Sequence, residues 1–353
     1  MKNLANILVI GTGTIGEPLI GLLAELRKKL GITEVMFHKR TPMIEQIAKV
    51  ESMVKRGAKL VVNDNMVDGF VKLGHKPQYT FDEAYAKANV VIDCTPAGNK
   101  HKEKHYLKTK NKTFIAQGSE KGFGIPYAYG INDIALVKQK NQFIQVVSCN
   151  THNICSLIKT LSPGFDRIIN ADFVCIRRAN DISQDGKFIA SPQVGEHNDT
   201  NCGTHHARDA SRVLETLYQY KSLYSSAMKI NSQYMHCIRF NITLLGSVST
   251  SGALDMFREN KFTALTHKTS ANKVFSFGRD HGYYGRIYNQ TVVSIPSISA
   301  TPLSGKTRVT GFCFTPQDGN SLLSSVAAAM YAIYGKEYLS HMSHFDQMLF
   351  SEI

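Results

Sequence analysis

Short apolar runs alternate with helix-like segments over the first 148 residues. Residues 6–10, 34–37 and 90–94 are apolar runs of strand length, and residues 17–30 carry apolar side chains at helical spacing. Strands that alternate with helices are typical of parallel sheets built from crossover units. This half of the chain therefore predicts an α/β fold with a Rossmann-like, doubly wound parallel sheet.

After residue 161 the pattern changes. Strand-like runs follow with few helices between them, at residues 168–178, 233–249, 292–296 and 307–314. A polar stretch with scattered glycines, residues 184–203, predicts a long loop. The order favours an α+β arrangement, in which helices pack on a mostly antiparallel sheet. We expect a Rossmann domain at residues 1–148 and a catalytic α+β domain at residues 149–319.

A glycine-rich turn joins the first strand to the first helix. It reads Gly11-Thr12-Gly13-Thr14-Ile15-Gly16 and matches GxGxxG in the context that a dinucleotide site requires. The first glycine permits a tight turn, the second lets the backbone approach a pyrophosphate, and the third lets the helix pack closely on the strand. The helix N-terminus then faces the phosphates. We therefore predict dinucleotide binding at this turn.

The tip of the second strand bears on the choice of dinucleotide. Sites specific for NAD usually place a carboxylate here to bind the ribose hydroxyls. This tip reads His38-Lys39-Arg40-Thr41 and holds no carboxylate. Two cations and a hydroxyl suit a 2′-phosphate, which Arg40 can grip with two parallel hydrogen bonds. We predict NADP as the cofactor and keep NAD as the alternative, in which Lys39 and Arg40 only face solvent.

Two further strand ends are expected to line the cofactor. In doubly wound sheets, ligands lie at the carboxyl ends of the strands. Residues 90–94 end in Thr95-Pro96-Ala97-Gly98, and residues 113–116 end in Gln117-Gly118-Ser119. We therefore expect Thr95 beside the cofactor and Gly118 close to the nicotinamide. A plain turn is the alternative role of Gly118.

Cys149 follows an apolar run at residues 144–147 and precedes a helix-like segment at residues 151–161. A cysteine at such a junction lies near unpaired backbone N–H groups and the positive end of the helix dipole, which favour the thiolate. We hypothesise that Cys149 is a covalent nucleophile. The alternative is a small buried thiol. Cys94 and Cys155 are expected to be packed and inert, and His152 is expected to point away from the thiol.

Composition and charge narrow the class of protein. The chain has 353 residues, of which 43% are hydrophobic and 20% charged, and its net charge is +13. Such a charge attracts anions, but the lysines cluster in loop-like segments without a nucleic-acid motif, so we expect no nucleic-acid partner. No signal peptide, membrane-length apolar run or CxxC pair is present. We expect a cytoplasmic protein without a disulfide framework, a metal site or a membrane partner.

Six segments together suggest a family. GTGTIGEPL, DCTPAG, QGSEKG, VVSCNTHNIC, IRRANDIS and THHARDA occur in an order that resembles the archaeal type of glyceraldehyde-3-phosphate dehydrogenase. That family is similar in architecture to the aspartate-semialdehyde dehydrogenases. The resemblance implies an N-terminal dinucleotide domain, a catalytic α+β domain, a last helix near residues 320–335 that returns to the first domain, and a homotetramer.

The resemblance also implies roles for individual residues. Cys149 matches the nucleophile, and Ser148 and Asn150 lie beside the substrate. His205 and His206 match paired histidines that handle substrate and protons. The positions that match cofactor contacts are Thr14, Ile15, Gly118, Arg177 and Gln317, of which Arg177 matches a site for cofactor or phosphate.

The chemistry that these residues suggest needs few groups. A thiolate attacks an aldehyde, hydride passes to the nicotinamide, and inorganic phosphate releases an acyl phosphate from the thioester. We expect His206 to act as the base, with His205 as the alternative, because a histidine pKa lies near the working pH. Backbone N–H groups around Asn150 would stabilise the oxyanion. Arg177 and Arg178 are candidates to hold phosphates, and an ion pair at the surface is the alternative for Arg178.

Two other functions remain open at this point. The first is an acyl-CoA reductase that makes a semialdehyde from malonyl-CoA or succinyl-CoA with NADPH, because it passes through the same thioester. The second is a non-catalytic nucleotide-binding protein, which would not need an activated thiol. The expected substrate is accordingly a small phosphorylated aldehyde with inorganic phosphate, or an acyl-CoA.

Overall fold

The computed structural model describes residues 5–137, 140–181, 184–186, 188–316 and 318–353. These residues form two compact units. Unit 1 comprises Met1–Tyr127, Leu136–Val146 and Leu322–His344, and unit 2 comprises Ala128–Ala135, Val147–Ser321 and Phe345–Ile353. Each unit has its own sheet and its own hydrophobic core.

Unit 1 is built on an eight-stranded sheet in which neighbouring strands are parallel. The strand order is β4-β3-β2-β1-β5-β6-β8-β7. The strands are β1 (Asn6–Ile10), β2 (Glu34–His38), β3 (Lys59–Val62), β4 (Tyr79–Thr80), β5 (Val90–Asp93), β6 (Thr113–Gln117), β7 (Ile125–Tyr127) and β8 (Phe143–Val146). The predicted doubly wound parallel sheet is therefore confirmed.

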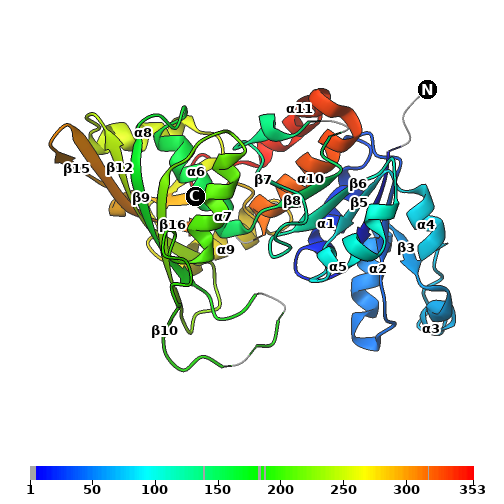
Figure 1. Cartoon of the computed structure of the whole chain (residues 1–353). Coiled ribbons are helices and arrows are strands. Elements are labelled where there is room, and N and C mark those ends of the chain that lie inside the picture. Colours follow the sequence, from blue (N-terminus) through cyan, green and yellow to red (C-terminus); the bar gives the residue numbers. More distant parts are fainter. Residues whose placement is uncertain (1–4, 138–139, 182–183, 187, 317) are drawn as a thin grey trace. The chain divides into compact units, whose positions relative to one another are not determined.

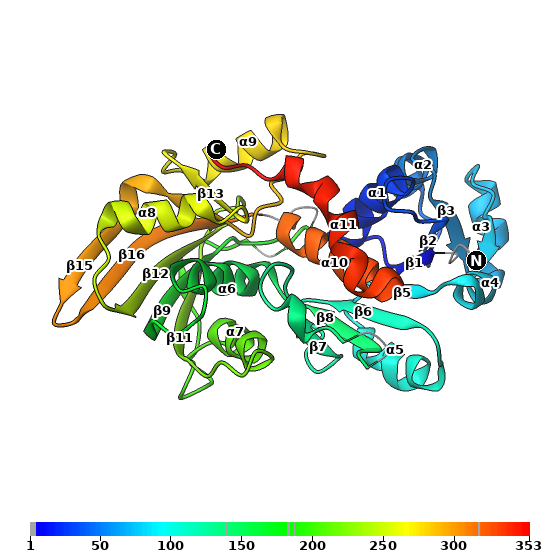
Figure 2. The same cartoon turned by 90° about the horizontal axis from the view of Figure 1, so that it is seen from above.

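Helices cover both faces of this sheet (Figure 2). One face carries α1 (Gly16–Leu26), α2 (Ile47–Lys55) and most of α10 (Gly319–Tyr334), and the other carries α4 (Phe81–Lys87) and α5 (Gly98–Lys104). The remaining helices of the unit are α3 (Val67–Lys72) and α11 (Tyr338–Met342). Because both faces are covered, the central strands are buried and mostly apolar, as in β1, where all five residues are buried.

The first helix is shorter than predicted. The apolar spacing extends to Leu30, but α1 ends at Leu26 and the chain turns at Gly31, where φ is +64°. Leu30 is nonetheless buried, because the turn carries its side chain into the core. Periodicity therefore records which residues are buried and overestimates the length of the helix.

Unit 2 is built on a mixed sheet with the order β10-β11-β9-β12-β16-β14-β13, and β15 pairs with β16. The strands are β9 (Ile168–Arg177), β10 (Gln193–Val194), β11 (Ser222–Lys229), β12 (His236–Leu245), β13 (Thr263–Thr266), β14 (Thr291–Ser294), β15 (Ser299–Leu303) and β16 (Lys306–Thr315). β9 with β11 and β13 with β14 are parallel, and the other pairs are antiparallel. The predicted mostly antiparallel sheet is confirmed.

Four long helices pack in unit 2 (Figure 1). They are α6 (Cys149–Leu161), α7 (His205–Glu215), α8 (Thr250–Glu259) and α9 (Ala271–His281). The apolar side chains of α6, among them Ile154, Leu157 and Leu161, are fully buried in the core of this unit. α6 therefore holds its first residue, Cys149, at a defined place over the sheet.

The described residues contain no helix with the length and apolar character that a membrane span requires.

Candidate functional site

Four neighbouring strands of unit 1 end in residues that were predicted to bind the cofactor. The strands β2, β1, β5 and β6 lie side by side and are all parallel. Their carboxyl ends therefore meet at one edge of the sheet. The predicted residues at that edge are Lys39 and Arg40 after β2, Gly11, Gly13, Thr14, Ile15 and Gly16 after β1, Thr95 after β5 and Gly118 after β6.

The glycines of the glycine-rich turn differ in what surrounds them. Gly11 has φ +92°, a conformation that L side chains rarely adopt. A Cβ on Gly16 would lie 2.0 Å from the carbonyl oxygen of Gly11, so only glycine fits where the helix approaches the turn. A Cβ on Gly13, in contrast, would meet no atom within 4 Å. Gly13 therefore faces open space, into which a phosphate can come close to the backbone.

The tip of β2 gathers positive charge beside this turn. Lys39 is only 8% exposed, and burial lowers the pKa of its ammonium, as do the nearby charges of Lys49 and Arg40. Lys49, from α2, was not predicted. Its Nζ donates to the carbonyl oxygen of Thr12, 2.9 Å away, and lies 2.8 Å from a carboxylate oxygen of Glu17. Lysines on helices are common, so nothing in the local pattern distinguishes Lys49.

A buried carboxylate holds the turn after β5. Asp93 accepts hydrogen bonds from His101 Nδ1 at 2.6 Å and from the Tyr106 hydroxyl at 2.7 Å, and its other oxygen accepts from the backbone N–H and hydroxyl of Thr95. Burial acts to raise the pKa of Asp93, but these hydrogen bonds outweigh it and leave the pKa below its ordinary value. Thr95 is therefore firmly positioned, beside the place where a Cβ on Gly11 would lie.

Cys149 is the first residue of α6 in unit 2. Ser148 caps this helix, since its Oγ accepts from the backbone N–H of Thr151 at 3.4 Å. The carbonyl oxygen of Cys149 accepts from Asn320 Nδ2 at 3.1 Å, and the buried Asn150 accepts from the hydroxyl of Thr315 at 3.1 Å. The thiol is half-buried. The helix cap and two residues far along the chain, Thr315 and Asn320, therefore hold the backbone around Cys149.

The ionisation state of Cys149 differs from the one that the sequence favoured. Burial, together with the nearby carboxylates of Asp318 and Asp181, raises the pKa of the thiol to about 11. The guanidinium of Arg178 and the backbone N–H of Asn150 act in the opposite direction without offsetting burial. Cys149 therefore rests as a thiol near neutral pH, so a base must accept its proton when it reacts.

Arg178 is a buried cation beside Cys149. Its side chain is 5% exposed, and Nη2 donates to Asp181 Oδ1 at 2.7 Å, while the buried Nε has no hydrogen-bond partner. Its backbone N–H donates to Nδ1 of His236 at 3.1 Å. Burial lowers the pKa of His236 to about 3, so this histidine is neutral and serves to position Arg178. Arg178 itself is buried, but its partner Asp181 is 48% exposed, and Arg177 ends β9 next to Arg178.

A second cation was not predicted. Arg286 Nη2 lies 3.7 Å from Asp318 Oδ2, and its buried Nε has no hydrogen-bond partner. Asp318 is buried and has φ +59°, a conformation that is uncommon for residues other than glycine. Burial raises the pKa of Asp318, and the charges of Arg286 and Arg178 lower it. These residues come from segments far apart in the sequence, so no local spacing could have found them.

The predicted histidine pair opens α7. The rings of His205 and His206 stack with their centroids 4.0 Å apart, His205 is exposed, and His206 is 2% exposed with Nδ1 3.0 Å from the hydroxyl of Thr204. α7 packs beside α6, where Cys155 Sγ lies 3.9 Å from the carbonyl oxygen of Ala210 (Figures 1 and 2). Because α6 precedes β9 and α7 precedes β11 in a parallel pair, both helices run in the same direction. Cys149 and the histidines therefore occupy first turns of neighbouring helices.

The remaining residues that the sequence singled out include His152, Cys94 and Cys155. His152 is fully buried, its Nδ1 donates to the carbonyl oxygen of Ser148, and burial lowers its pKa to about 4. Burial raises the pKa of Cys94 and of Cys155, which disfavours their thiolate forms. Gln317 lies outside the described residues. Within those residues, no three His, Cys, Asp or Glu side chains gather in a way that could hold a metal ion.

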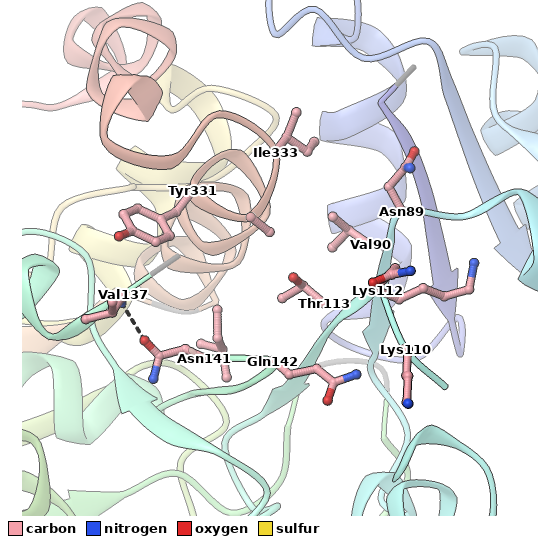
Figure 3. Close-up of a pocket in the computed structure, with 13 residues that line it drawn as sticks. Asn89, Val90, Lys110, Lys112, Thr113, Val137, Asn141, Gln142, Tyr331 and Ile333 are labelled. Atoms are coloured by element: carbon pink, nitrogen blue, oxygen red, sulfur yellow. Dashed lines mark hydrogen bonds between the residues drawn. The ribbon is translucent and has the colours of Figure 1, made fainter. Parts of the chain in front are cut away.

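A cavity of about 640 Å³ lies elsewhere in unit 1 (Figure 3). Its walls include Val90, Thr113 and Tyr331, so it adjoins the amino ends of β5 and β6 and the last turns of α10. The ammonium of Lys112 points away from it, toward the carbonyl oxygens of Ala86 and Ala88. Ligands of doubly wound sheets bind at the carboxyl ends of the strands, so this cavity is not the cofactor site.

No protein-family model matches the chain. Several individual proteins are similar to it in sequence. Glyceraldehyde-3-phosphate dehydrogenase from Methanobacterium formicicum is 30% identical over 258 residues, which cover 70% of this chain and 70% of that protein. The enzyme of the same name from Sulfolobus acidocaldarius is 26% identical over 297 residues, with 82% and 81% covered, and that from Methanothermus fervidus is 25% identical over 281 residues, with 77% and 78% covered. The parallel sheet with its glycine-rich turn, the cysteine that opens α6 and these similarities lead to one conclusion: the chain belongs to the archaeal type of the glyceraldehyde-3-phosphate dehydrogenase family.

Proposed function

We propose that this chain is an NADP-dependent phosphorylating glyceraldehyde-3-phosphate dehydrogenase with Cys149 as its nucleophile. The observation that carries the proposal is a half-buried thiol at the first turn of α6, beside the buried guanidinium of Arg178, in a chain whose relatives bear that enzyme's name. A thiol next to a cation that can hold a phosphate suits a small phosphorylated aldehyde.

The residues at the carboxyl edge of the parallel sheet fit a nicotinamide dinucleotide. The open space at Gly13 admits a pyrophosphate, and the cations at the β2 tip suit the 2′-phosphate of NADP. The bound nicotinamide supplies a hydride acceptor for aldehyde oxidation. The residues that would hold the dinucleotide are Gly11, Gly13, Thr14, Ile15, Gly16, Lys39, Arg40, Thr95 and Gly118, together with Arg177 and Gln317.

The chain's own residues would account for the covalent steps. The sulfur of Cys149 attacks the aldehyde carbon while His206, or His205 in its place, accepts the thiol proton, and the product is a hemithioacetal. A base is needed because the pKa of the thiol is about 11. The backbone N–H of Asn150 stabilises the oxyanion. Loss of hydride leaves a thioester on Cys149.

Release of the product needs inorganic phosphate. A phosphate oxygen attacks the thioester carbon, the C–S bond breaks, and the acyl phosphate leaves as the sulfur regains its proton from the histidine. Arg178 is suited to hold a phosphate because its buried Nε has a hydrogen-bond donor to spare. Ser148 and Asn150 would line the same site. The resemblance adds a homotetramer in the cytoplasm, which a measurement of mass in solution would test.

The direct test follows absorbance at the nicotinamide band with purified protein, glyceraldehyde 3-phosphate, inorganic phosphate and NADP. We expect reduction of NADP that requires phosphate, no activity in Cys149→Ser, and about a 10²–10⁴-fold loss in His206→Asn. Cys202→Ser, which changes another half-buried thiol of unit 2, is the matched control and should remain active.

Other outcomes would reject the proposal. Oxidation that ignores phosphate and requires CoA, or reduction of malonyl-CoA or succinyl-CoA with NADPH, would identify an acyl-CoA reductase. Unchanged activity in Cys149→Ser would remove the covalent mechanism, and a protein that binds the dinucleotide without any turnover would be a nucleotide-binding protein only.

A further inference from the structure

Three cations surround the tip of β2 next to the glycine-rich turn. Lys39 and Arg40 follow the strand directly, and Lys49 reaches the same place from α2. The carboxylates that act on them are Glu17, which is paired with Lys49, and Glu45, which acts on Lys39. Three positive charges thus lie near these two carboxylates, and Lys39 is only 8% exposed.

Such a cluster is costly without an anion. Like charges repel one another, and burial removes the water that would solvate Lys39. A phosphate monoester brings a charge of about −1.5 to −2 at neutral pH and several acceptor oxygens, so it would offset this excess. The cluster lies at the carboxyl end of a parallel strand, where the ribose of a bound dinucleotide is held in folds of this kind.

Lys49 lies between the glycine-rich turn and the tip of β2. Its Nζ donates to the carbonyl oxygen of Thr12 at 2.9 Å, inside the turn expected to hold the pyrophosphate. It also contacts Glu17 at 2.8 Å, and 25% of its side chain is exposed. An ammonium has three N–H donors, so one remains for a ligand after these two contacts.

We propose that Lys49 completes a 2′-phosphate subsite with Lys39 and Arg40 and determines the preference for NADP over NAD. The inference rests on the proposed cofactor and adds a residue from a helix that the strand-tip pattern does not include. Arg40 is exposed and Lys39 is buried, and with Lys49 they would hold the 2′-phosphate through their positive charges.

The test measures binding and needs no turnover. NADPH and NADH are titrated against wild type and Lys49→Met by nicotinamide fluorescence, with 2′-AMP as a competing probe of the phosphate subsite. We expect the Kd for NADPH to rise about tenfold or more in Lys49→Met, while the Kd for NADH changes less than twofold. Lys55→Met is the matched control, because Lys55 lies on the same helix, is 73% exposed and pairs with Glu51; it should leave both constants unchanged.

Several outcomes would overturn the inference. Equal weakening of NADPH and NADH would mean that Lys49 only supports the glycine-rich turn through Thr12, and no change in either would mean that it does not contact the ligand. Lys49→Arg keeps the positive charge and should retain the preference for NADPH. If Lys49→Met does not fold, Lys49→Arg is compared with wild type at low and high salt instead.

A wild type that binds NADH as tightly as NADPH would reject the subsite itself. A wild type that prefers NADPH but does not oxidise glyceraldehyde 3-phosphate would reject the proposed reaction and leave the subsite standing.

Discussion

At the scale of single residues, the thiol of Cys149 shows how burial and charge compete. The helix N-terminus and Arg178 favour the thiolate, but desolvation outweighs them and raises the pKa to about 11. A neutral thiol is less prone to alkylation and oxidation than a thiolate. The thiol of Cys149 is therefore protonated near neutral pH.

Asp318 contributes to this state, and its effect can be measured. Replacing its carboxylate with the neutral amide in Asp318→Asn removes a negative charge that raises the pKa of Cys149. The pKa of the thiol should fall, and alkylation of Cys149 by iodoacetamide near neutral pH should become about tenfold faster. Mass spectrometry of the peptide that contains Cys149, over a range of pH, measures the rate.

The control for this prediction is Asp280→Asn, because Asp280 is an exposed carboxylate on α9 that pairs with its neighbour Arg279. Its alkylation profile should match that of wild type. An unchanged profile in Asp318→Asn, or slower alkylation, would show that Asp318 does not control the ionisation of Cys149.

At the scale of elements, the strand–turn–helix unit at the N-terminus assigns different tasks to its glycines. Gly16 permits close packing, since a Cβ there would lie 2.0 Å from the Gly11 carbonyl oxygen. Gly13 has no such neighbour and faces open space. One glycine is therefore required by the fold, and the other is expected to be required by the ligand.

The pair Gly16→Ala and Gly13→Ala separates these tasks. Gly16→Ala should lower the free energy of unfolding by about 1–3 kcal/mol, because the backbone must shift to relieve the clash. Gly13→Ala should leave the free energy of unfolding within about 1 kcal/mol of wild type but weaken the binding of NADPH. Urea unfolding and fluorescence titration measure the two effects. Equal destabilisation by both substitutions would contradict this division.

At the scale of the whole molecule, the chain passes between the two units after Tyr127, Ala135, Val146, Ser321 and His344. The fourth passage falls inside α10, which is continuous from Gly319 to Tyr334. The first residues of α10, up to Ser321, belong to unit 2 and the rest belong to unit 1, and a helix is a cooperative element. Because the chain passes repeatedly between the units, we expect them to unfold in one cooperative transition.

We accordingly expect a single cooperative transition by calorimetry. NADPH, although it is expected to bind unit 1, should raise the temperature of the whole transition, since ligand at 100 times its Kd adds about 2.7 kcal/mol of stability. Two separate transitions, of which NADPH shifts only one, would show that the units unfold independently despite the shared helix.

Much of the architecture was predictable because its signals are local. The strand runs, the change of pattern after residue 161 and the glycine-rich turn follow from backbone periodicity and the conformational freedom of glycine. The parallel sheet of unit 1 and the mostly antiparallel sheet of unit 2 agree with these patterns. Short or weakly patterned elements such as β4, β11 and α9 were not anticipated, because their hydrogen bonds or packing partners come from distant residues.

The amino-acid sequence alone determined which residues are proposed to carry chemistry: a cysteine before a helix, a pair of histidines, and cations where a carboxylate would select NAD. Tertiary structure decided how these residues behave. Burial sets Cys149 as a thiol, Asp93 holds Thr95, and Lys49 and Arg286 reach their sites from distant segments. The reason is that charge, solvation and hydrogen bonding act through space, whereas sequence patterns report only what neighbours along the chain share.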